Sequence, residues 1–285
     1  MTVIFSEVGF GAGGLDDPRL SEADAERLVS AALDLGVTVF DTARSYGASE
    51  ERLGRALRGV RDRAVVFTKG GYGIEGAADW TGAAVTRGIE EAIVRLGREP
   101  LDGFLLHSCD LQTLERGDVP LALVRAREAG KVRLTGYSGE GAGLAWAAER
   151  RETFSVLECS LSPLDQANLA LIARAAQGDF CVLAKRPLAN APWRFATRPD
   201  REDIAVYWDR LHALGFDPAP LAWDELALRF TAFQPGVTTA LVGTTRIEHL
   251  ASAVAAVRAG ALPVDVSERL RGAFAARGRG WPGLV

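Results

Sequence analysis

Short apolar runs alternate with amphipathic stretches from one end of this 285-residue chain to the other. The runs are rich in β-branched and aromatic residues and carry few polar side chains, which is typical of strands buried on both faces. The eight expected strands are 8–12, 37–42, 64–69, 102–107, 134–138, 156–161, 181–187 and 239–244.

Helical signals fill most of the intervals between these runs. Ser21 opens a helix with Asp24 as its capping-box partner, and Gly36 ends that helix. Eight strand–helix pairs predict an α/β fold, a closed parallel (β/α)8 or TIM barrel, with residues 1–285 in one domain. An open doubly wound sheet is the alternative. However, the glycine-rich turn at 9–14 lacks the later acidic strand end of a dinucleotide fingerprint.

Two stretches interrupt the alternation. Residues 70–79 form a glycine-rich loop after the third strand, and residues 189–220 form a long insertion after the seventh. Within the insertion, 202–214 has the pattern of an amphipathic helix. Loops of this length in compact domains are usually functional or disordered.

Composition excludes several classes of protein. A formal net charge of −4 with mixed signs gives no basic surface for nucleic acid or membranes. Three scattered cysteines are too few for a disulfide framework or a zinc site, and we expect no metal. The first residues lack a signal-peptide pattern, and no apolar run reaches bilayer length, so we expect a cytoplasmic protein. The oligomeric state cannot be inferred.

Four chemically distinct side chains lie at or just beyond the ends of consecutive expected strands. Asp41 and Tyr46 belong to F-D-T-A-R-S-Y-G, Lys69 ends V-V-F-T-K, and His107 ends F-L-L-H. Because active sites of such barrels occupy the C-terminal ends of the strands, these side chains should meet there. A carboxylate, a phenol, an ammonium and an imidazole together can form a proton-transfer site.

The chemistry of this group follows from its charges. A phenol has a pKa near 10, and a neighbouring lysine should lower it. Asp41 could hold Lys69 charged, and a neutral His107 could donate a hydrogen bond to a substrate oxygen. Taken singly, the Asp–Lys pair could be structural, the tyrosine a turn residue and the histidine a rim residue. Their occurrence on consecutive strands favours the functional interpretation.

Residues 36–54, G-V-T-V-F-D-T-A-R-S-Y-G-A-S-E-E-R-L-G, resemble the signature of the aldo-keto reductase family. The resemblance continues through V-V-F-T-K, L-D-G-F-L-L-H, G-K-V-R-L-T-G-Y-S, L-A-K-R-P-L-A-N and L-V-G-T-T-R-I-E-H-L, over nearly the whole chain. It implies that Tyr46 is the general acid, that Lys69 and Asp41 tune it, and that His107 orients the carbonyl. It also implies an NADP(H) cofactor and a small aldehyde, ketone or sugar substrate.

The turn after the eighth expected strand supplies part of the expected cofactor site. Thr245 and Glu248 have capping-box spacing, and a helix N-terminus beside a cation suits an anion. In the family this turn holds the 2′-phosphate, so Arg246 and His249 favour NADP over NAD. The alternative is an ordinary cap with a solvated arginine. The residues expected to bind here are Gly243, Thr244, Thr245, Arg246 and His249.

The resemblance places the nicotinamide half of the cofactor near the other strand ends. Ser138 matches a carboxamide-binding serine, while Gly139 replaces the usual asparagine and Glu158 aligns with the usual glutamine. The family's adenine-binding Glu-Asn pair is Ser252-Ala253. A stacking aromatic is replaced, leaving Lys185 or Arg186 to cover the ring. The remaining residues expected to bind cofactor are Gly11, Ser138, Gly139, Glu158, Lys185, Arg186, Pro187 and Leu188.

These observations favour an NADP-dependent oxidoreductase that transfers hydride between nicotinamide and a carbonyl or alcohol. Two alternatives remain open. One is a non-catalytic NADP-binding redox sensor or regulatory barrel, and the other is an aldose-oxidising dehydrogenase on the same scaffold.

Overall fold

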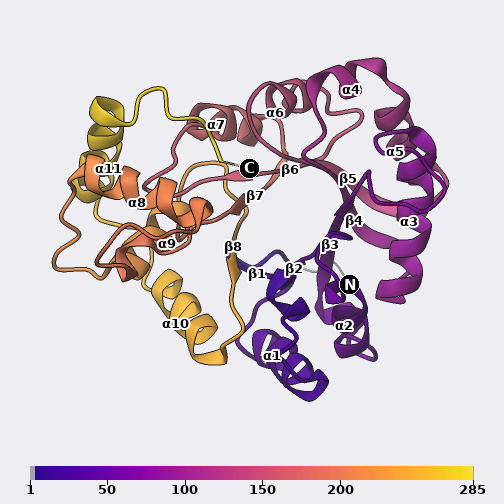
Figure 1. The fold of residues 1–285 in the computed structure, drawn as a ribbon, viewed down its shortest axis with the longest axis horizontal. Coiled ribbons are helices and arrows are strands. Elements are labelled where there is room, and N and C mark those ends of the chain that lie inside the picture. The colour runs from indigo at the N-terminus through magenta and orange to yellow at the C-terminus, as the bar shows by residue number, and fades with distance from the viewer. Residues whose placement is uncertain (1–3, 285) are drawn as a thin grey trace.

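A closed barrel of eight parallel strands forms the centre of the computed structural model, which describes residues 4–284 (Figure 1). Each strand pairs with the next one along the chain, and β8 closes the barrel against β1. The predicted barrel is confirmed and the open sheet is excluded. The strands are β1 Val8–Gly11, β2 Val39–Asp41, β3 Val65–Gly70, β4 Leu101–His107, β5 Val132–Ser138, β6 Val156–Ser160, β7 Cys181–Lys185 and β8 Thr239–Gly243.

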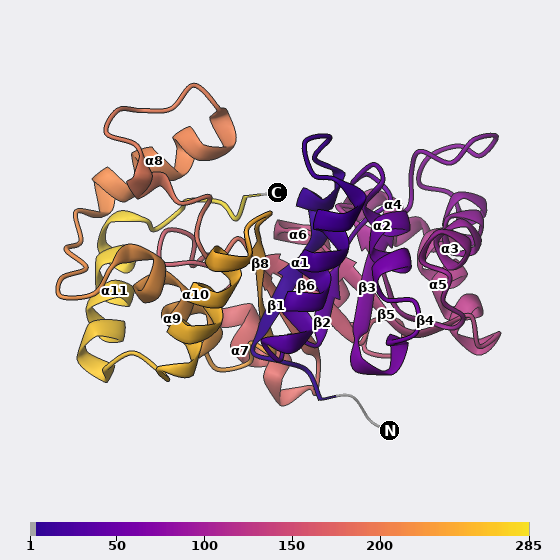
Figure 2. The same ribbon diagram turned by 90° about the horizontal axis from the view of Figure 1, so that it is seen from below.

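Helices cover the outside of the barrel (Figures 1 and 2). Among the described residues these are α1 Glu22–Asp34, α2 Ser49–Ala56, α3 Gly82–Leu96, α4 Leu111–Arg116, α5 Asp118–Glu128, α6 Gly141–Ala148, α7 Leu169–Gln177, α8 Glu202–Leu214, α9 Trp223–Ala232, α10 Ile247–Arg258 and α11 Val264–Arg277. Within residues 4–284, no helix has both the length and the apolar character needed to cross a membrane.

The strands read as continuous apolar runs because both of their faces are buried. In β3, Phe67 belongs to the cluster inside the barrel and Val66 to the larger cluster between strands and helices. The inner cluster is closed by side chains from other strands, including Leu105 and Leu183. Burying each such side chain contributes about 1.5–3 kcal/mol, so this packing fixes the positions of the strand ends.

Predicted helix boundaries hold where capping chemistry is strong. The Ser21 hydroxyl accepts a hydrogen bond from the Asp24 backbone N–H at 3.1 Å, as the capping box requires. Gly36, with φ at +88°, follows α1, and Gly97, with φ at +58°, caps α3. These are left-handed conformations that glycine adopts without strain.

The region after β7 differs most from expectation. The predicted helix at 202–214 is α8, with the same bounds, but α9 and α11 were not predicted, nor was α4. Helix α9, rather than α8, leads directly into β8, and α8, α9 and α11 lie together on one side of the barrel (Figure 2). Helix α11 buries Leu270 alone, which explains why its pattern gave no signal.

Several predicted ends were also wrong. Helix α7 begins only at Leu169, well after β6, because the intervening residues form a turn closed between Ser162 and Asp165. Strand β1 ends before Ala12, which starts a short 3-10 helix. Strand β7 ends at Lys185, since Arg186 has a φ of +55°, which is incompatible with an extended strand.

Candidate active site

Four side chains predicted from the strand ends come together at the mouth of the barrel. Asp41 ends β2, Lys69 lies near the end of β3, and His107 ends β4. The Tyr46 ring packs edge-on against the His107 ring with 5.9 Å between centroids. The Lys69 ammonium lies 5.4 Å from the centroid of the Tyr46 ring. Residues distant in sequence thus meet at one point.

Lys69 is fully buried and lies between two carboxylates. Its Nζ contacts the two oxygens of Asp41 at 2.5 and 2.6 Å and Oε2 of Glu158 at 3.2 Å. Both carboxylates are also buried. Glu158 was expected to bind cofactor, and its contact with Lys69 was missed. One signal could have revealed it, because a carboxylate inside the apolar strand 156–160 requires a buried cation.

Burial and the charged partners shift the pKa values of Lys69, Asp41 and Glu158 in opposite directions. Burial would lower the pKa of Lys69, but the facing carboxylates raise it well above its usual value, so Lys69 stays protonated. Burial and the Glu158 carboxylate raise the pKa of Asp41 against the attraction of Lys69. Burial acts in the same direction on Glu158, but Lys69 and Lys185 outweigh it and hold the pKa of Glu158 below its usual value.

The expected effect of Lys69 on Tyr46 is present, but the net pKa of Tyr46 is raised rather than lowered. Lys69 does lower the pKa of Tyr46, and it is the largest single influence. However, burial and the negative charges of Asp41 and Glu158 together outweigh it and raise the pKa of Tyr46 to about 12. The phenol is therefore protonated throughout the physiological range.

His107 is neutral under the same conditions. Burial, followed by the charge of Lys69, lowers its pKa to about 4. Its Nδ1 lies 3.2 Å from the Tyr72 hydroxyl and 3.4 Å from the Ser45 hydroxyl. With Nδ1 engaged in this way, Nε2 is the ring nitrogen that can reach a ligand in the barrel mouth.

A cavity of about 250 Å³ opens above this cluster. Of the residues expected to bind cofactor, Gly11, Glu158, Lys185, Arg186 and Gly243 line it. Its other walls are Gly13, Gly14, Asp41, Tyr46, His107, Ser108 and Leu241.

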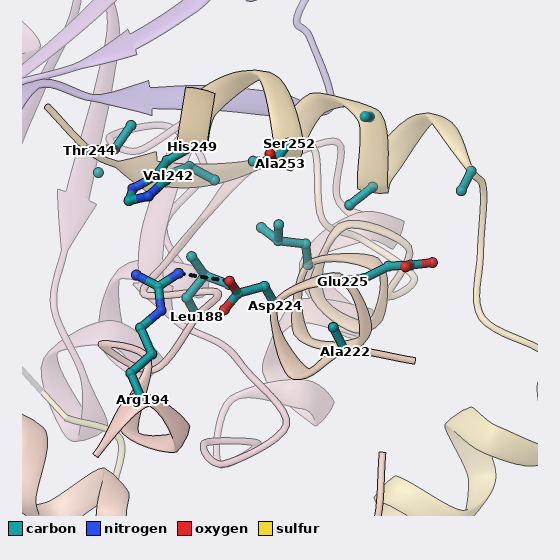
Figure 3. Close-up of a pocket in the computed structure, with 15 residues that line it drawn as sticks. Leu188, Arg194, Ala222, Asp224, Glu225, Val242, Thr244, His249, Ser252 and Ala253 are labelled. Atoms are coloured by element: carbon teal, nitrogen blue, oxygen red, sulfur yellow. Dashed lines mark hydrogen bonds and ion pairs between the residues drawn. The ribbon is translucent and has the colours of Figure 1, made fainter. Parts of the chain in front are cut away.

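A second cavity, of about 570 Å³, lies between α10, α9 and the segment after β7 (Figure 3). Arg194 and His249 point into it from opposite walls, and Arg194 is paired with Asp224 at 2.7 Å (Figure 3). Gly243 lines both cavities, so the two adjoin at the end of β8. Leu188, Thr244, Ser252 and Ala253 also line this second cavity.

The model of the Aldo/keto reductase family matches residues 7–273. The chain belongs to the aldo/keto reductase family. An aldo-keto reductase of Mycobacterium avium is 31% identical over 206 residues, covering 70% of this chain and 68% of the relative. One from Strobilurus tenacellus is 29% identical over 206 residues, and the match spans 66% of this chain but only 59% of that relative.

Solved structures of family members share the fold. An aldo-keto reductase of Bacillus halodurans in its holo form superposes with a TM-score of 0.82 at 22% identity, covering 94% of this chain and 92% of that one. An aldo-keto reductase of Klebsiella pneumoniae in complex with NADPH gives 0.73 at 24% identity, covering 96% and 91%. The aldo/keto reductase barrel is therefore the fold of this chain.

Ser138 and Gly139 lie beneath the mouth of the aldo/keto reductase barrel and outside the lining of either cavity. The Ser138 hydroxyl donates a hydrogen bond to Oε1 of Glu158 at 3.1 Å. A Cβ at position 139 would stand 2.6 Å from the Tyr137 hydroxyl, so an asparagine there would require Tyr137 to move. A carboxamide contact from either residue stays a prediction.

The turn after β8 departs from the predicted capping box. Helix α10 has Arg246 as its N-cap residue and no side-chain cap, so the box between Thr245 and Glu248 was wrong. The Thr244 hydroxyl instead accepts a hydrogen bond from the Arg246 backbone N–H at 3.1 Å. Arg246 is largely exposed, 3.8 Å from a Glu248 oxygen, and neither Thr245 nor Arg246 lines either of these two cavities.

The segment after β7 places its cations at the rim of the mouth. Lys185 Nζ lies 3.5 Å from Oε1 of Glu140, and Arg186 Nη1 donates to the Leu284 carbonyl at 2.7 Å. Both side chains line the smaller cavity, whereas Pro187 lies outside it and Leu188 lines the larger one. Whether Lys185 or Arg186 covers a nicotinamide ring stays a prediction.

Proposed function

We propose that this chain is an NADP-dependent carbonyl reductase that uses Tyr46 as general acid in reduction and general base in oxidation. The observation that carries the proposal is the Tyr46 phenol at the wall of a cavity, beside His107 and a buried Lys69. A structural ion pair explains Lys69 with Asp41, but it does not explain a tyrosine and a histidine placed at the same opening.

The shape of the site supports a dinucleotide cofactor. The two cavities adjoin at Gly243, so a ligand with two halves can extend from the barrel mouth toward α10. Glycines at 11, 13, 14 and 243 line this path and allow a close approach to the backbone. Klebsiella pneumoniae reductases of the same fold have been solved with NADPH and with NADP and acetate.

The residues of the barrel mouth have separate roles in the proposed carbonyl reduction. NADPH, if bound in these cavities, would supply the hydride for the carbonyl carbon. Tyr46 gives its phenolic proton to the carbonyl oxygen, and His107 Nε2 holds that oxygen by a hydrogen bond. Lys69 stabilises the phenolate left on Tyr46, since it is the closest source of positive charge. Alcohol oxidation uses the same groups in reverse.

The substrate class is a small aldehyde, ketone or sugar. A cavity of about 250 Å³ leaves little room for a larger carbonyl beside a nicotinamide. Among relatives, a 6-dehydroglucose reductase of Novosphingobium aromaticivorans is 30% identical over 147 residues, covering 48% of each chain. Its name supports including sugar carbonyls among the candidates.

The proposal is tested by following NADPH oxidation with a panel of aldehydes, ketones and aldoses. Turnover of at least one aldehyde or ketone, at a rate that depends on enzyme concentration, is the expected result. Tight NADPH binding without turnover of any compound would instead identify a non-catalytic sensor. Running the panel in reverse with NADP⁺ and aldoses separates an aldose-oxidising dehydrogenase, which would turn over aldoses and no simple alcohol.

A further inference from the structure

The ammonium of Lys69 is fully engaged by carboxylates. It has three N–H groups, and three carboxylate oxygens lie within 3.2 Å of Nζ. Two of these oxygens belong to Asp41 and the third to Glu158. Among the described residues, no hydrogen bond joins Lys69 to the Tyr46 hydroxyl, although Lys69 lies against the Tyr46 ring.

Glu158 is held in this position from two sides. Its Oε2 contacts Lys69, while its Oε1 accepts a hydrogen bond from Ser138 at 3.1 Å. Strand pairing fixes the arrangement further, because Ser138 lies between His107 of β4 and Glu158 of β6 in register. The side chain is buried, so rotation away from Lys69 would leave a buried charge without a partner.

We propose that Glu158 is a positioning residue that draws an N–H of Lys69 away from the Tyr46 hydroxyl and so keeps Tyr46 in its protonated, proton-donating form. This inference rests on the proposed function, because a protonated phenol matters only if Tyr46 donates a proton. It assigns Glu158 to the control of Tyr46, in addition to any contact with cofactor.

Other charged and titratable groups around Tyr46 set the background for this effect. Asp41 adds negative charge, Lys69 adds positive charge, and Tyr72 raises the pKa of Tyr46 slightly. His107 is neutral, and Lys185 faces Glu158 from β7. Removing the Glu158 charge leaves one carboxylate and one ammonium in the cluster. A neutral side chain at 158 accepts a hydrogen bond from Lys69 more weakly or not at all, so an N–H of Lys69 can turn to the phenol oxygen, and this change favours the phenolate together with the lost negative charge.

The test is alkaline titration of Tyr46 in the cofactor-free protein, followed by tyrosinate absorbance. The matched change is Glu158→Gln, which removes the charge and keeps the size of the side chain. Subtracting the same titration in the Tyr46→Phe background isolates Tyr46 from the other three tyrosines. We expect the midpoint to fall by about one pH unit or more, because a unit charge within roughly 10 Å at an effective dielectric near 20 contributes about that much.

Glu140→Gln serves as the control. Glu140 is a buried carboxylate at the same mouth, but it contacts Lys185 and not Lys69. It should leave the Tyr46 midpoint in place. If Glu158→Gln does not fold, as judged by circular dichroism, Glu158→Met provides a second neutral side chain of similar length with the same expected shift.

An unchanged Tyr46 midpoint in a folded Glu158→Gln or Glu158→Met protein would overturn the inference and leave Glu158 as a structural anchor for Lys69. An equal shift in Glu140→Gln would also overturn the inference, because any carboxylate near the mouth would then have the same effect on the Tyr46 midpoint. The titration needs no turnover. If the enzyme is active but the Tyr46 midpoint does not shift, this inference fails and the proposed function stands. If the midpoint shifts but the protein has no activity, the proposed function fails.

Discussion

The barrel mouth and the cavity beside α10 hold their charges in opposite ways. At the mouth, Asp41, Lys69 and Glu158 come from three strands, are buried, and are each other's partners. Beside α10, Arg194 and Asp224 come from a short 3-10 helix after β7 and from α9, and their side chains are nearly half exposed. Buried charges must be paired, whereas exposed pairs contribute about 0–1 kcal/mol and can rearrange.

The difference in burial indicates which charged pairs are fixed in place before a ligand binds. Removing any member of the buried cluster leaves its partners without compensation in a dry environment. Removing Arg194 leaves Asp224 with a hydrogen bond from the Trp193 indole and with access to solvent. We therefore expect large effects on chemistry at the mouth and smaller, cofactor-selective effects beside α10.

The largest of these effects is expected for Lys69→Met. Reduction should fall by roughly 10²–10⁴-fold or more, because the phenolate of Tyr46 loses the cation that stabilises it most. Since Lys69 lowers the pKa of Tyr46, its loss should also move the alkaline limb of the oxidation profile to higher pH. Lys131→Met, at a partly exposed lysine paired with Glu90, is the control. Near-normal reduction with an unchanged profile would make Lys69 structural.

A milder loss is expected for Asp41→Asn, since Glu158 still holds Lys69. The pH effect should have the opposite sign to that of Lys69→Met. Asp41 raises the pKa of Tyr46, so removing its charge should move the oxidation profile to lower pH. The measurement is the same pair of pH profiles, and a shift to higher pH in both variants would refute this account of the cluster.

Arg246→Ala and Arg194→Ala test which of the two arginines binds the 2′-phosphate of the cofactor. A charge-assisted contact with the 2′-phosphate contributes about 1.5–3 kcal/mol, or roughly ten- to hundred-fold in affinity. Arg246→Ala should therefore weaken NADPH binding and leave NADH binding nearly unchanged. The measurement is the dissociation constant of NADPH and of NADH for both variants and for wild type. If only Arg194→Ala shows the selective loss, the phosphate is held by the cation that points into the larger cavity.

The smallest effect concerns the two oxidation states of the cofactor. Only the oxidised nicotinamide is cationic, and a charge about 5 Å away at an effective dielectric near 20 would interact by roughly 3 kcal/mol. Lys69 offsets much of the Glu158 charge, so we expect about 1 kcal/mol in favour of NADP⁺. Glu158→Gln should bind NADPH at least as well as wild type and NADP⁺ about fivefold less well. An unchanged ratio of the two dissociation constants would count against this.

Sequence patterns predicted the barrel and the convergence of Asp41, Tyr46, Lys69 and His107 for one physical reason. Parallel strands buried on both faces give clear apolar runs, and the ends of such strands must meet at one edge. The partner of Lys69 on β6 was missed because strand register, which brings Glu158 across the barrel, is set by tertiary packing.

The region after β7 was harder to predict. Helix α11 buries a single side chain from those described, so its pattern carries no periodic signal. The Thr245–Glu248 capping box had the right spacing, but a competing hydrogen bond from Arg246 N–H to Thr244 started α10 later. Arg194 enters the larger cavity through a turn whose conformation, with Ala191 at a φ of +52°, no pattern of apolar residues encodes.

Tyr46→Phe tests the central claim most directly. The variant keeps the ring that packs against His107 and removes only the hydroxyl, so fold and NADPH binding should be retained. The rate of NADPH oxidation, by stopped-flow or steady-state measurement with the best aldehyde from the panel, is compared between wild type and variant at matched cofactor saturation. We predict a fall in reduction of roughly 10²–10⁴-fold or more. Reduction near the wild-type rate in a folded, NADPH-saturated Tyr46→Phe protein would contradict the assignment of Tyr46 as the proton donor.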